Sequence, residues 1–105
     1  MAELHSKNIV HRDIKMENVL MSRTMGVKVT DFGFAKELAG EEQLHDLCGT
    51  LCYIAPEMIK AEYGFNPEGY GKSVDMWACG VLLYMLLMGN PPFYHANRVS
   101  LAGVK

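Results

Sequence analysis

Three side chains in the first third of the chain carry oxygen atoms suited to binding a divalent metal ion. Asp13 and Asn18 lie five residues apart in one segment, and Asp31 follows a short β-prone run. Magnesium prefers hard oxygen ligands, so one carboxylate, one amide and the phosphates of a nucleotide would suffice to hold it. With Lys15 adding a positive charge, these residue types suit phosphoryl transfer, which mainly requires positioned groups and neutralised charge. The alternative interpretation is that each is a polar loop residue that caps a turn.

The same residues belong to three short motifs in a fixed order. Residues 11–18 read His-Arg-Asp-Ile-Lys-Met-Glu-Asn, which matches the pattern H-R-D-x-x-x-x-N of protein kinase catalytic loops. Asp-Phe-Gly follows at 31–33 and Ala-Pro-Glu at 55–57. Any one tripeptide would be weak evidence, but three in this order are specific. The chain therefore resembles eukaryotic protein kinases over essentially its whole length.

This resemblance implies a role for each residue of the motifs. Asp13 would accept or orient the proton of the substrate hydroxyl, Asn18 and Asp31 would hold Mg²⁺, and Lys15 would lie beside the transferring phosphoryl group of ATP. Thr50 would complete the catalytic set by hydrogen-bonding to Asp13 and Lys15. The resemblance also implies further ATP-binding residues and a structural set: Glu17, Leu20 as the floor under adenine, His11 and Phe32 in the hydrophobic spine, Glu57, and Asp75 as a brace for the catalytic-loop backbone.

Several longer segments narrow the resemblance. Lys15, two residues after Asp13, is typical of the serine/threonine branch. The family of phosphorylase kinase gamma subunits, within the calmodulin-dependent group, is similar in the segments Asp31-Phe32-Gly33-Phe34, Cys48-Gly49-Thr50, Gly69-Tyr70-Gly71-Lys72, Val74-Asp75-Met76-Trp77 and Pro91-Pro92-Phe93. That resemblance implies a protein substrate with serine in a basic context, and calmodulin and regulatory subunits as partners. The chain departs from the family at Met16 and Leu51, where a proline is usual.

The segment between the second and third motifs predicts a form of regulation. Residues 34–49 contain no Ser, Thr or Tyr, although many kinases with Arg before the catalytic Asp order this loop by phosphorylation. Asp46 stands where the resembled family carries a permanent acidic side chain. We therefore hypothesise that Asp46 pairs with Arg12 and holds the loop active without phosphorylation. The alternative is that Asp46 is an ordinary solvated acid.

The elements that must position these residues can be predicted in outline. Val19–Met21 and Val27–Thr30 are β-prone runs that predict a small hairpin, and residues 34–52 predict a long loop. A helix is expected from about Ser73 to Met88, with Ser73 as its N-cap and Gly89 as its stop. The fold class is then α+β: a partial protein-kinase C-lobe, mainly helical, with a small β-hairpin and a long activation segment.

The expected domain, residues 1–105, is a kinase-domain fragment that runs from the catalytic loop to the start of a helix after Pro92. The predicted helix is apolar all round, and such a helix must be surrounded by protein. The sequence shows no glycine-rich loop and no V-A-I-K lysine, so we expect the nucleotide-covering lobe and the last helices to be missing. The chain alone should then bind ATP weakly and transfer phosphate poorly. A non-catalytic, pseudokinase-like binding module is the alternative.

The composition indicates a soluble globular protein, with 50% hydrophobic and 21% charged residues. A net charge of −2 gives no overall basic field, so neither nucleic acid nor an anionic membrane is expected as a partner. The acidic residues gather in residues 31–62, which would favour basic peptide substrates. Three cysteines without C-x-x-C spacing suggest neither a disulfide framework nor a zinc site, so a cytoplasmic protein is expected.

Overall fold

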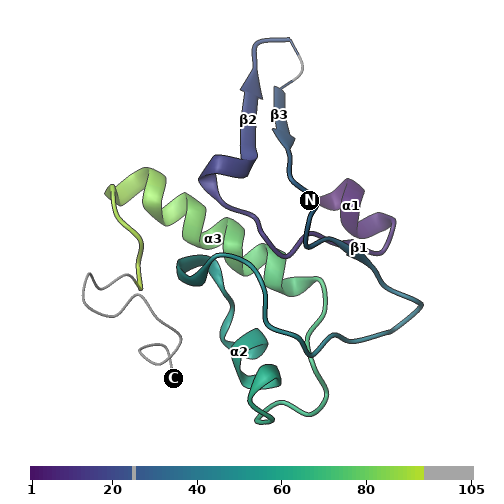
Figure 1. The fold of residues 1–105 in the computed structure, drawn as a ribbon. Helices are drawn as coiled ribbons and strands as arrows, with labels where there is room; N and C mark the ends of the chain where they lie inside the picture. The colour runs from purple at the N-terminus through teal and green to yellow at the C-terminus, as the bar shows by residue number, and fades with distance from the viewer. Residues whose placement is uncertain (25, 94–105) are drawn as a thin grey trace.

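The computed structural model describes residues 1–24 and 26–93, which form short helices and two small antiparallel sheets (Figure 1). The helix predicted after Pro92 lies outside the described residues. The elements follow one another as α1 (Ala2–Ser6), β1 (Ile9–Val10), η1 (Met16–Asn18), β2 (Val19–Ser22), β3 (Gly26–Val29), β4 (Lys36–Glu37), η2 (Leu51–Tyr53), α2 (Pro56–Glu62) and α3 (Ser73–Met88), where η marks a 3-10 helix.

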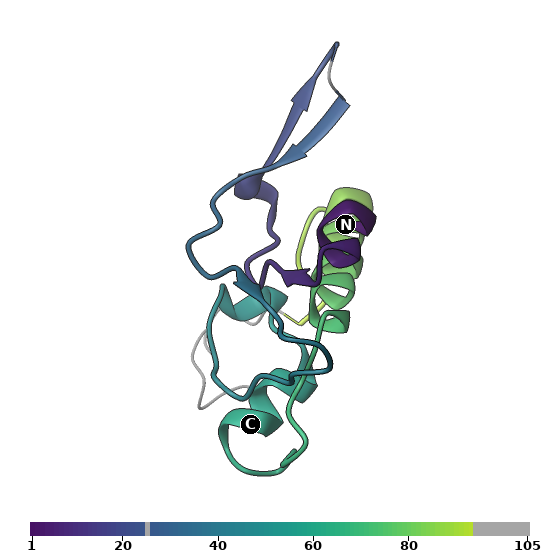
Figure 2. The same ribbon diagram turned by 90° about the vertical axis from the view of Figure 1, so that its right-hand side faces the viewer.

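The predicted hairpin is confirmed. Strands β2 and β3 pair antiparallel, with Val19 opposite Val29 and Ser22 opposite Gly26. The hairpin stands out from the rest of the molecule in both ribbon views (Figures 1 and 2). Because β2 follows η1 directly and β3 leads into the Asp-Phe-Gly segment, the base of the hairpin brings these two segments together.

The prediction of an unbroken loop over residues 34–52 was partly wrong. Strand β4 pairs antiparallel with β1, with Ile9 opposite Glu37 and Val10 opposite Lys36. Further along, Leu44 forms an isolated antiparallel bridge with Tyr70, and η2 ends the segment. Pairings of one or two residues are too short to produce a detectable hydrophobic period, so tertiary contacts alone determine them.

The bounds of the long helix α3 are those predicted, but its N-cap is not. The cap residue is Lys72, no side chain caps the helix, and Ser73 is already its first residue. The predicted stop is confirmed: Gly89 has φ +85°, in the left-handed region that favours glycine, and its N–H donates to Met85 O at 2.9 Å. The chain then turns back, and the ring of Phe93 stacks on that of Trp77 with 5.6 Å between centroids.

Two clusters of buried side chains form the core, and α3 contributes to both. One joins β1, residues 34–55 (the expected activation segment), α2, Tyr70 and the first turn of α3. The other joins residues 11–18 (the expected catalytic loop), η2 and the middle of α3. The first contains Val10, Leu38, Leu44, Ala55, Met58, Ala61, Tyr70 and Val74, and the second contains Ile14, Tyr53, Ala78 and Val81.

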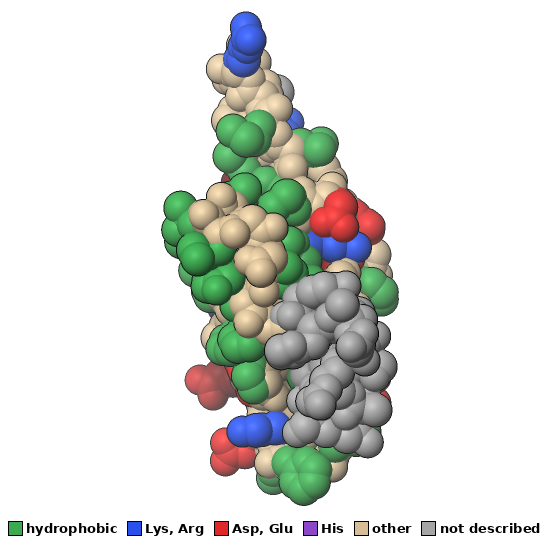
Figure 3. All heavy atoms as spheres, turned by 90° about the vertical axis from the view of Figure 1, so that its left-hand side faces the viewer, with side chains coloured by type: hydrophobic (Ala, Val, Ile, Leu, Met, Phe, Trp, Pro, Cys, Tyr) green, Lys and Arg blue, Asp and Glu red, His purple; other side chains and the backbone are tan. Residues whose placement is uncertain are grey.

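The second half of α3 has no comparable cover among the described residues. Leu83, Leu86, Leu87 and Met88 are all exposed, and Leu87 keeps 75% of its accessible surface. Hydrophobic side chains gather on the face of the molecule shown in Figure 3. Within residues 1–24 and 26–93 the helix is therefore covered on one face only, and the expectation that protein surrounds it on all sides is not met by these residues. No helix of this part of the chain is long and apolar enough to cross a bilayer.

Candidate functional site

A buried carboxylate on α3 holds the backbone at the start of the catalytic loop. Asp75, 1% exposed, accepts hydrogen bonds from the N–H of His11 (2.8 Å) and from the N–H of Arg12 (2.9 Å), and its Oδ2 lies 3.0 Å from Nε2 of His5. These donors compensate a burial that would otherwise cost several kcal/mol. Arg12 has φ +69°, so its backbone can point the N–H at Asp75 while the side chain leaves on the other side. The loop therefore begins in a fixed conformation.

His11 links the catalytic loop to the segment after the hairpin. Its Nδ1 accepts the N–H of Asp13 at 3.1 Å, and its Nε2 lies 3.0 Å from Thr30 O, which can only accept. The two contacts together require the neutral ring with its hydrogen on Nε2. The Phe32 ring lies edge-on to His11, with 4.9 Å between centroids. His11 and Phe32, the two residues expected in the hydrophobic spine, are thus in direct contact.

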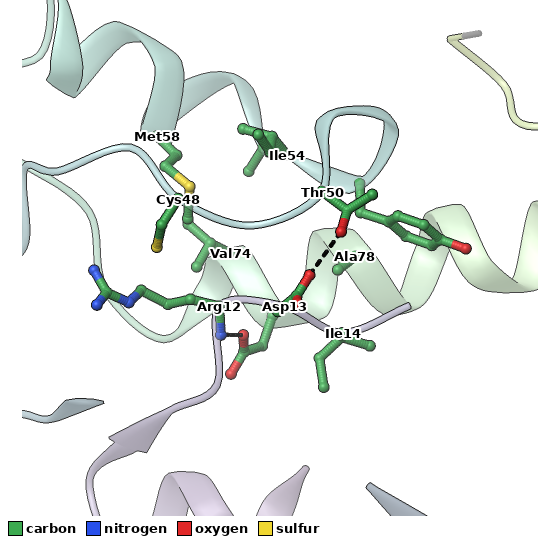
Figure 4. A pocket seen from close by; sticks show the side chains of 12 residues that line it. Arg12, Asp13, Ile14, Cys48, Thr50, Ile54, Met58, Val74 and Ala78 are labelled. Atoms are coloured by element: carbon green, nitrogen blue, oxygen red, sulfur yellow. Dashed lines mark hydrogen bonds between the residues drawn. The ribbon is translucent and has the colours of Figure 1, made fainter. Parts of the chain in front are cut away.

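Asp13 lies at the centre of a side-chain network. The Thr50 hydroxyl donates to its Oδ1 at 2.9 Å (Figure 4). The Lys15 Nζ lies 3.8 Å from Asp13 Oδ2. The amide nitrogen of Asn18 donates to Asp13 O at 3.0 Å and approaches Oδ2 at 3.4 Å. Thr50 was expected to hydrogen-bond to both Asp13 and Lys15. Within the described part of the chain it bonds to Asp13 and not to Lys15. Asp13, Lys15, Asn18 and Thr50 are nonetheless brought together.

The base of the hairpin places Asp31 next to Asn18. The N–H of Thr30 donates to Asn18 O at 2.8 Å, and Asp31 is the next residue along the chain. Asp31 is exposed, has φ +57°, and accepts the N–H of Gly33 on its Oδ1 at 3.2 Å. Because the amide nitrogen of Asn18 bonds to Asp13, its amide oxygen is left for another partner. An amide oxygen and an exposed carboxylate on adjacent turns are the hard donors that Mg²⁺ prefers, so the residues present fit that ion.

Arg12 connects the catalytic loop to the activation segment. Its NH1 donates to Asp46 Oδ1 at 2.8 Å and to the Tyr70 hydroxyl at 3.0 Å, and its Nε donates to Phe34 O at 2.8 Å. The Tyr70 hydroxyl in turn donates to Asp46 O at 2.6 Å. Burial lowers the pKa of Arg12, but the Tyr70 hydroxyl and the nearby acids more than offset this and keep its pKa above the ordinary value. The guanidinium is therefore a permanent cation that three segments share.

Tyr70 is the residue of this site to which sequence reasoning assigned no role. It is 2% exposed, and burial raises its pKa to about 12 even though Arg12 acts in the opposite direction. The backbone of Tyr70 also pairs with Leu44, with both N–H to O distances at 2.8 Å. The sequence offered one signal for Tyr70, an aromatic residue between two glycines in a polar loop. This pattern indicates a ring buried within a turn, but it does not show which residues the hydroxyl contacts.

A glycine allows the activation segment to pass close to the catalytic loop. Gly49 has φ +103°, and a Cβ built on it would lie 2.5 Å from Arg12 O. Next to it, burial raises the pKa of the Cys48 thiol, with Arg12 opposing, so this cysteine stays protonated at neutral pH. Figure 4 shows Cys48, Thr50, Arg12 and Asp13 around the small pocket beneath the loop.

The remaining predicted residues lie away from this network. Leu20 is on β2 and 53% exposed, and Glu17 is exposed in η1. Glu57 lies in the first turn of α2, where a carboxylate interacts favourably with the helix dipole. Among the described residues, the Glu57 carboxylate makes no ion pair or hydrogen bond.

Comparison with known proteins gives a consistent result. The pattern of the family described as protein kinase domain matches residues 1–103. The phosphorylase b kinase gamma catalytic chain, liver/testis isoform, of Mus musculus is 50% identical over 96 residues, which cover 91% of this chain and 24% of that protein. The putative serine/threonine-protein kinase PRKY of Homo sapiens is 48% identical over 94 residues, 90% of this chain and 31% of the relative.

A third relative is similar over nearly the same stretch. The cAMP-dependent protein kinase catalytic subunit of Dictyostelium discoideum is 48% identical over 98 residues, 93% of this chain and 14% of that protein. The chain thus spans about a quarter of the length of the phosphorylase b kinase gamma chains that it matches.

Proposed function

Because this chain belongs to the protein kinase domain family, we propose that it acts in a serine/threonine protein kinase, which transfers the γ-phosphate of ATP to a hydroxyl group of a protein substrate. The observation that carries this proposal is the network around Asp13, which joins Lys15, Thr50 and Asn18 and has Asp31 on the adjacent turn. A module that only binds a partner would not need all of these groups in contact.

Each residue of the network has a task in such a reaction. The Asp13 carboxylate orients the substrate hydroxyl and takes its proton, while Thr50 fixes the rotation of that carboxylate through Oδ1. Lys15 places a positive charge beside the transferring group, 3.8 Å from Asp13. Asn18 and Asp31 would hold Mg²⁺, which when bound neutralises charge on the ATP phosphates. Glu17 and Leu20 complete the ATP-binding set in this proposal.

The substrate and the partners are proposed on similarity to named relatives. We infer a protein substrate that presents serine in a basic context, because the acidic residues gather in residues 31–62 and half of the matched residues are identical in a phosphorylase b kinase gamma chain. Calmodulin and regulatory subunits are proposed as partners on the same resemblance. The cysteine usage supports a cytoplasmic setting.

We further propose that Asp46 replaces a phosphate in holding the activation segment. Its carboxylate lies 2.8 Å from the Arg12 guanidinium, whose side chain is 9% exposed. A phosphate that orders a kinase loop acts through the same kind of charge pair. Tyr70 strengthens this proposal, because its hydroxyl contacts both partners of the pair.

The chain is proposed to be one part of a larger kinase domain that includes a nucleotide-covering lobe. The exposed apolar half of α3 supports this, because a helix with apolar residues on all sides requires protein around it. The length of the phosphorylase kinase relatives, of which the chain covers 24%, is in agreement. Taken alone, the chain should transfer phosphate poorly.

The test is phosphate transfer by the full-length protein from ATP to a serine peptide with basic flanks. Asp13→Asn should lower kcat by at least 10²-fold, because it removes the proton acceptor. Asp31→Asn should lower turnover and raise the Mg²⁺ concentration needed for half of the remaining maximal rate, because it weakens a metal ligand. Glu68→Gln, which neutralises an exposed carboxylate outside the network, is the matched control and should leave turnover unchanged. Full turnover of Asp13→Asn would contradict the proposal.

A further inference from the structure

A backbone N–H in the catalytic loop makes a hydrogen bond that a proline at the same position could not make. The N–H of Met16 donates to the Tyr53 hydroxyl at 3.2 Å, across 37 residues of sequence. Proline is usual at this position in the resembled family, and proline has no N–H to donate. Its ring would also place Cδ where the hydrogen points, toward the Tyr53 oxygen. The Tyr53 hydroxyl can therefore accept this bond only because residue 16 is not proline.

This bond is the second of two side-chain hydrogen bonds that join the catalytic loop to residues 50–53 in the described structure. The first is the Thr50 hydroxyl on Asp13 Oδ1, at the residue that precedes η2. The second is at Tyr53, the last residue of η2, whose own N–H donates to Thr50 O at 2.9 Å. Lys15 lies in the sequence between the two attachment points on the loop. The pair of bonds thus fixes both ends of a four-residue stretch of loop against one turn of 3-10 helix.

The Tyr53 side chain is well placed to act as an anchor. It is 5% exposed and packs in the same cluster as Ile14, Ala78 and Val81, so its ring has little freedom to follow a moving loop. Burial raises the pKa of Tyr53, and the Met16 N–H opposes this only in part. The hydroxyl is therefore neutral at physiological pH and remains an acceptor for the N–H.

We propose that Tyr53, through the N–H of Met16, is a positioning residue that holds Lys15 and Asp13 in register with η2 during phosphoryl transfer. This inference rests on the proposed kinase function. It means that Met16, which stands where proline is usual, adds a hydrogen bond to the loop. In this arrangement the loop and η2 move as one unit, so loosening the second bond misplaces the catalytic groups without removing any of them.

The experiment is a double-mutant cycle in the full-length protein with Tyr53→Phe and Met16→Pro. Tyr53→Phe removes only the hydroxyl. Met16→Pro removes the N–H, and Lys15 already has the extended backbone (φ −158°, ψ 167°) that tolerates a following proline. The first position of a 3-10 helix also suits the fixed φ of proline. Met16→Ala keeps the N–H and is the reference against which Met16→Pro is measured.

We expect Tyr53→Phe to lower kcat about fivefold, the loss that corresponds to one neutral hydrogen bond, while KM for ATP changes less than twofold. Met16→Pro should lower kcat by at least as much relative to Met16→Ala. In a protein that already carries Tyr53→Phe, the same Met16→Pro change should have almost no further effect, because the bond is already absent. A cycle of unfolding midpoints should show the same non-additivity, independently of activity.

The outcomes are distinguishable. Losses in kcat that multiply would overturn the inference, as would a fall in the unfolding midpoint with kcat unchanged, which would make the bond merely structural. A wild-type protein without turnover would remove the proposed function and with it the positioning role, whereas coupled unfolding midpoints would still report the bond. Non-additive losses in kcat together with an unchanged KM for ATP would support the inference in full.

Discussion

The two halves of α3 differ in their surroundings. In the first half, Asp75 is buried at 1% exposure and accepts the backbone of the catalytic loop, while Val74 and Ala78 lie in the two core clusters. In the second half, large apolar side chains such as Leu87 are exposed. Asp75 is thus buried, while most of the large apolar side chains of the second half stay exposed among the described residues.

This contrast shows that burial follows the partners available and not hydrophobicity alone. A carboxylate can be buried where two backbone N–H groups and a histidine meet it, because hydrogen bonds replace the lost water. An apolar face is buried only where another surface of matching shape covers it. The polar contacts of the first half fix the site, and the second half is the part that the described residues leave largely uncovered.

The largest effect that we expect comes from removing the buried carboxylate. Asp75→Ala leaves the N–H groups of His11 and Arg12 without their acceptor, and should lower the free energy of unfolding by about 3–5 kcal/mol. Denaturant titration would measure this. If Asp75→Ala were no more destabilising than Glu68→Gln on the surface, the buried half of α3 would not depend on this carboxylate.

A smaller effect should appear on the exposed half. In the full-length protein, Leu87→Ser should lower the free energy of unfolding by about 2 kcal/mol, because we propose that further chain buries this side chain. Phe65→Ser, at an exposed position on the turn after α2, is the control and should change it by less than about 0.5 kcal/mol. Equal effects of the two substitutions would mean that the second half of α3 stays exposed in the full-length protein as well.

The activation segment extends the comparison to activity. Asp46→Ala removes the acid paired with Arg12 and should lower turnover about fivefold, the loss expected for one charge-assisted hydrogen bond of about 1 kcal/mol at a partly exposed site. Turnover is measured beside Glu41→Gln, an exposed acid in the same segment that makes no side-chain contact in the described structure. If Asp46→Ala leaves turnover unchanged, Asp46 is an ordinary solvated acid without a regulatory role.

The last effect is absent at neutral pH and appears only at high pH. Burial raises the pKa of Tyr70 to about 12 from an ordinary value of 10, so the folded state binds its proton more tightly than the unfolded state. The stability contributed by this difference is complete below pH 10 and is lost as the pH rises from 10 to about 12. Tyr70→Phe should therefore weaken the fall of the unfolding midpoint in that range, and Tyr84→Phe, at an exposed tyrosine, should not. Identical slopes for the two variants would contradict the burial of the Tyr70 hydroxyl.

The sequence allowed the local elements to be predicted and left most long-range contacts undetermined. The hairpin and the bounds of α3 followed from β-prone runs and from a glycine stop, which are properties of neighbouring residues. Ser73 was wrongly expected to cap α3, because the sequence cannot show that the chain enters the helix one residue earlier, at Lys72. Strand β4 was missed because two residues carry no period.

The candidate site divides in the same way. Motif spacing singled out Asp13, Asn18 and Asp31, and the structure brings the first two into contact and places the third beside them. Tyr70 and Tyr53 received no role, because each acts through a hydroxyl that reaches a segment more than 20 residues away. No local pattern encodes such a contact, so it becomes visible only when the chain is folded.

The glycine at position 49 has a consequence for how this region can change. Its missing side chain is what lets the activation segment run against the carbonyl of Arg12, where a methyl group would stand 2.5 Å from the oxygen. Even alanine would have to push the two segments apart and carry Thr50 away from Asp13. Position 49 is therefore closed to every other amino acid, and random mutagenesis of this segment should return glycine alone among functional clones.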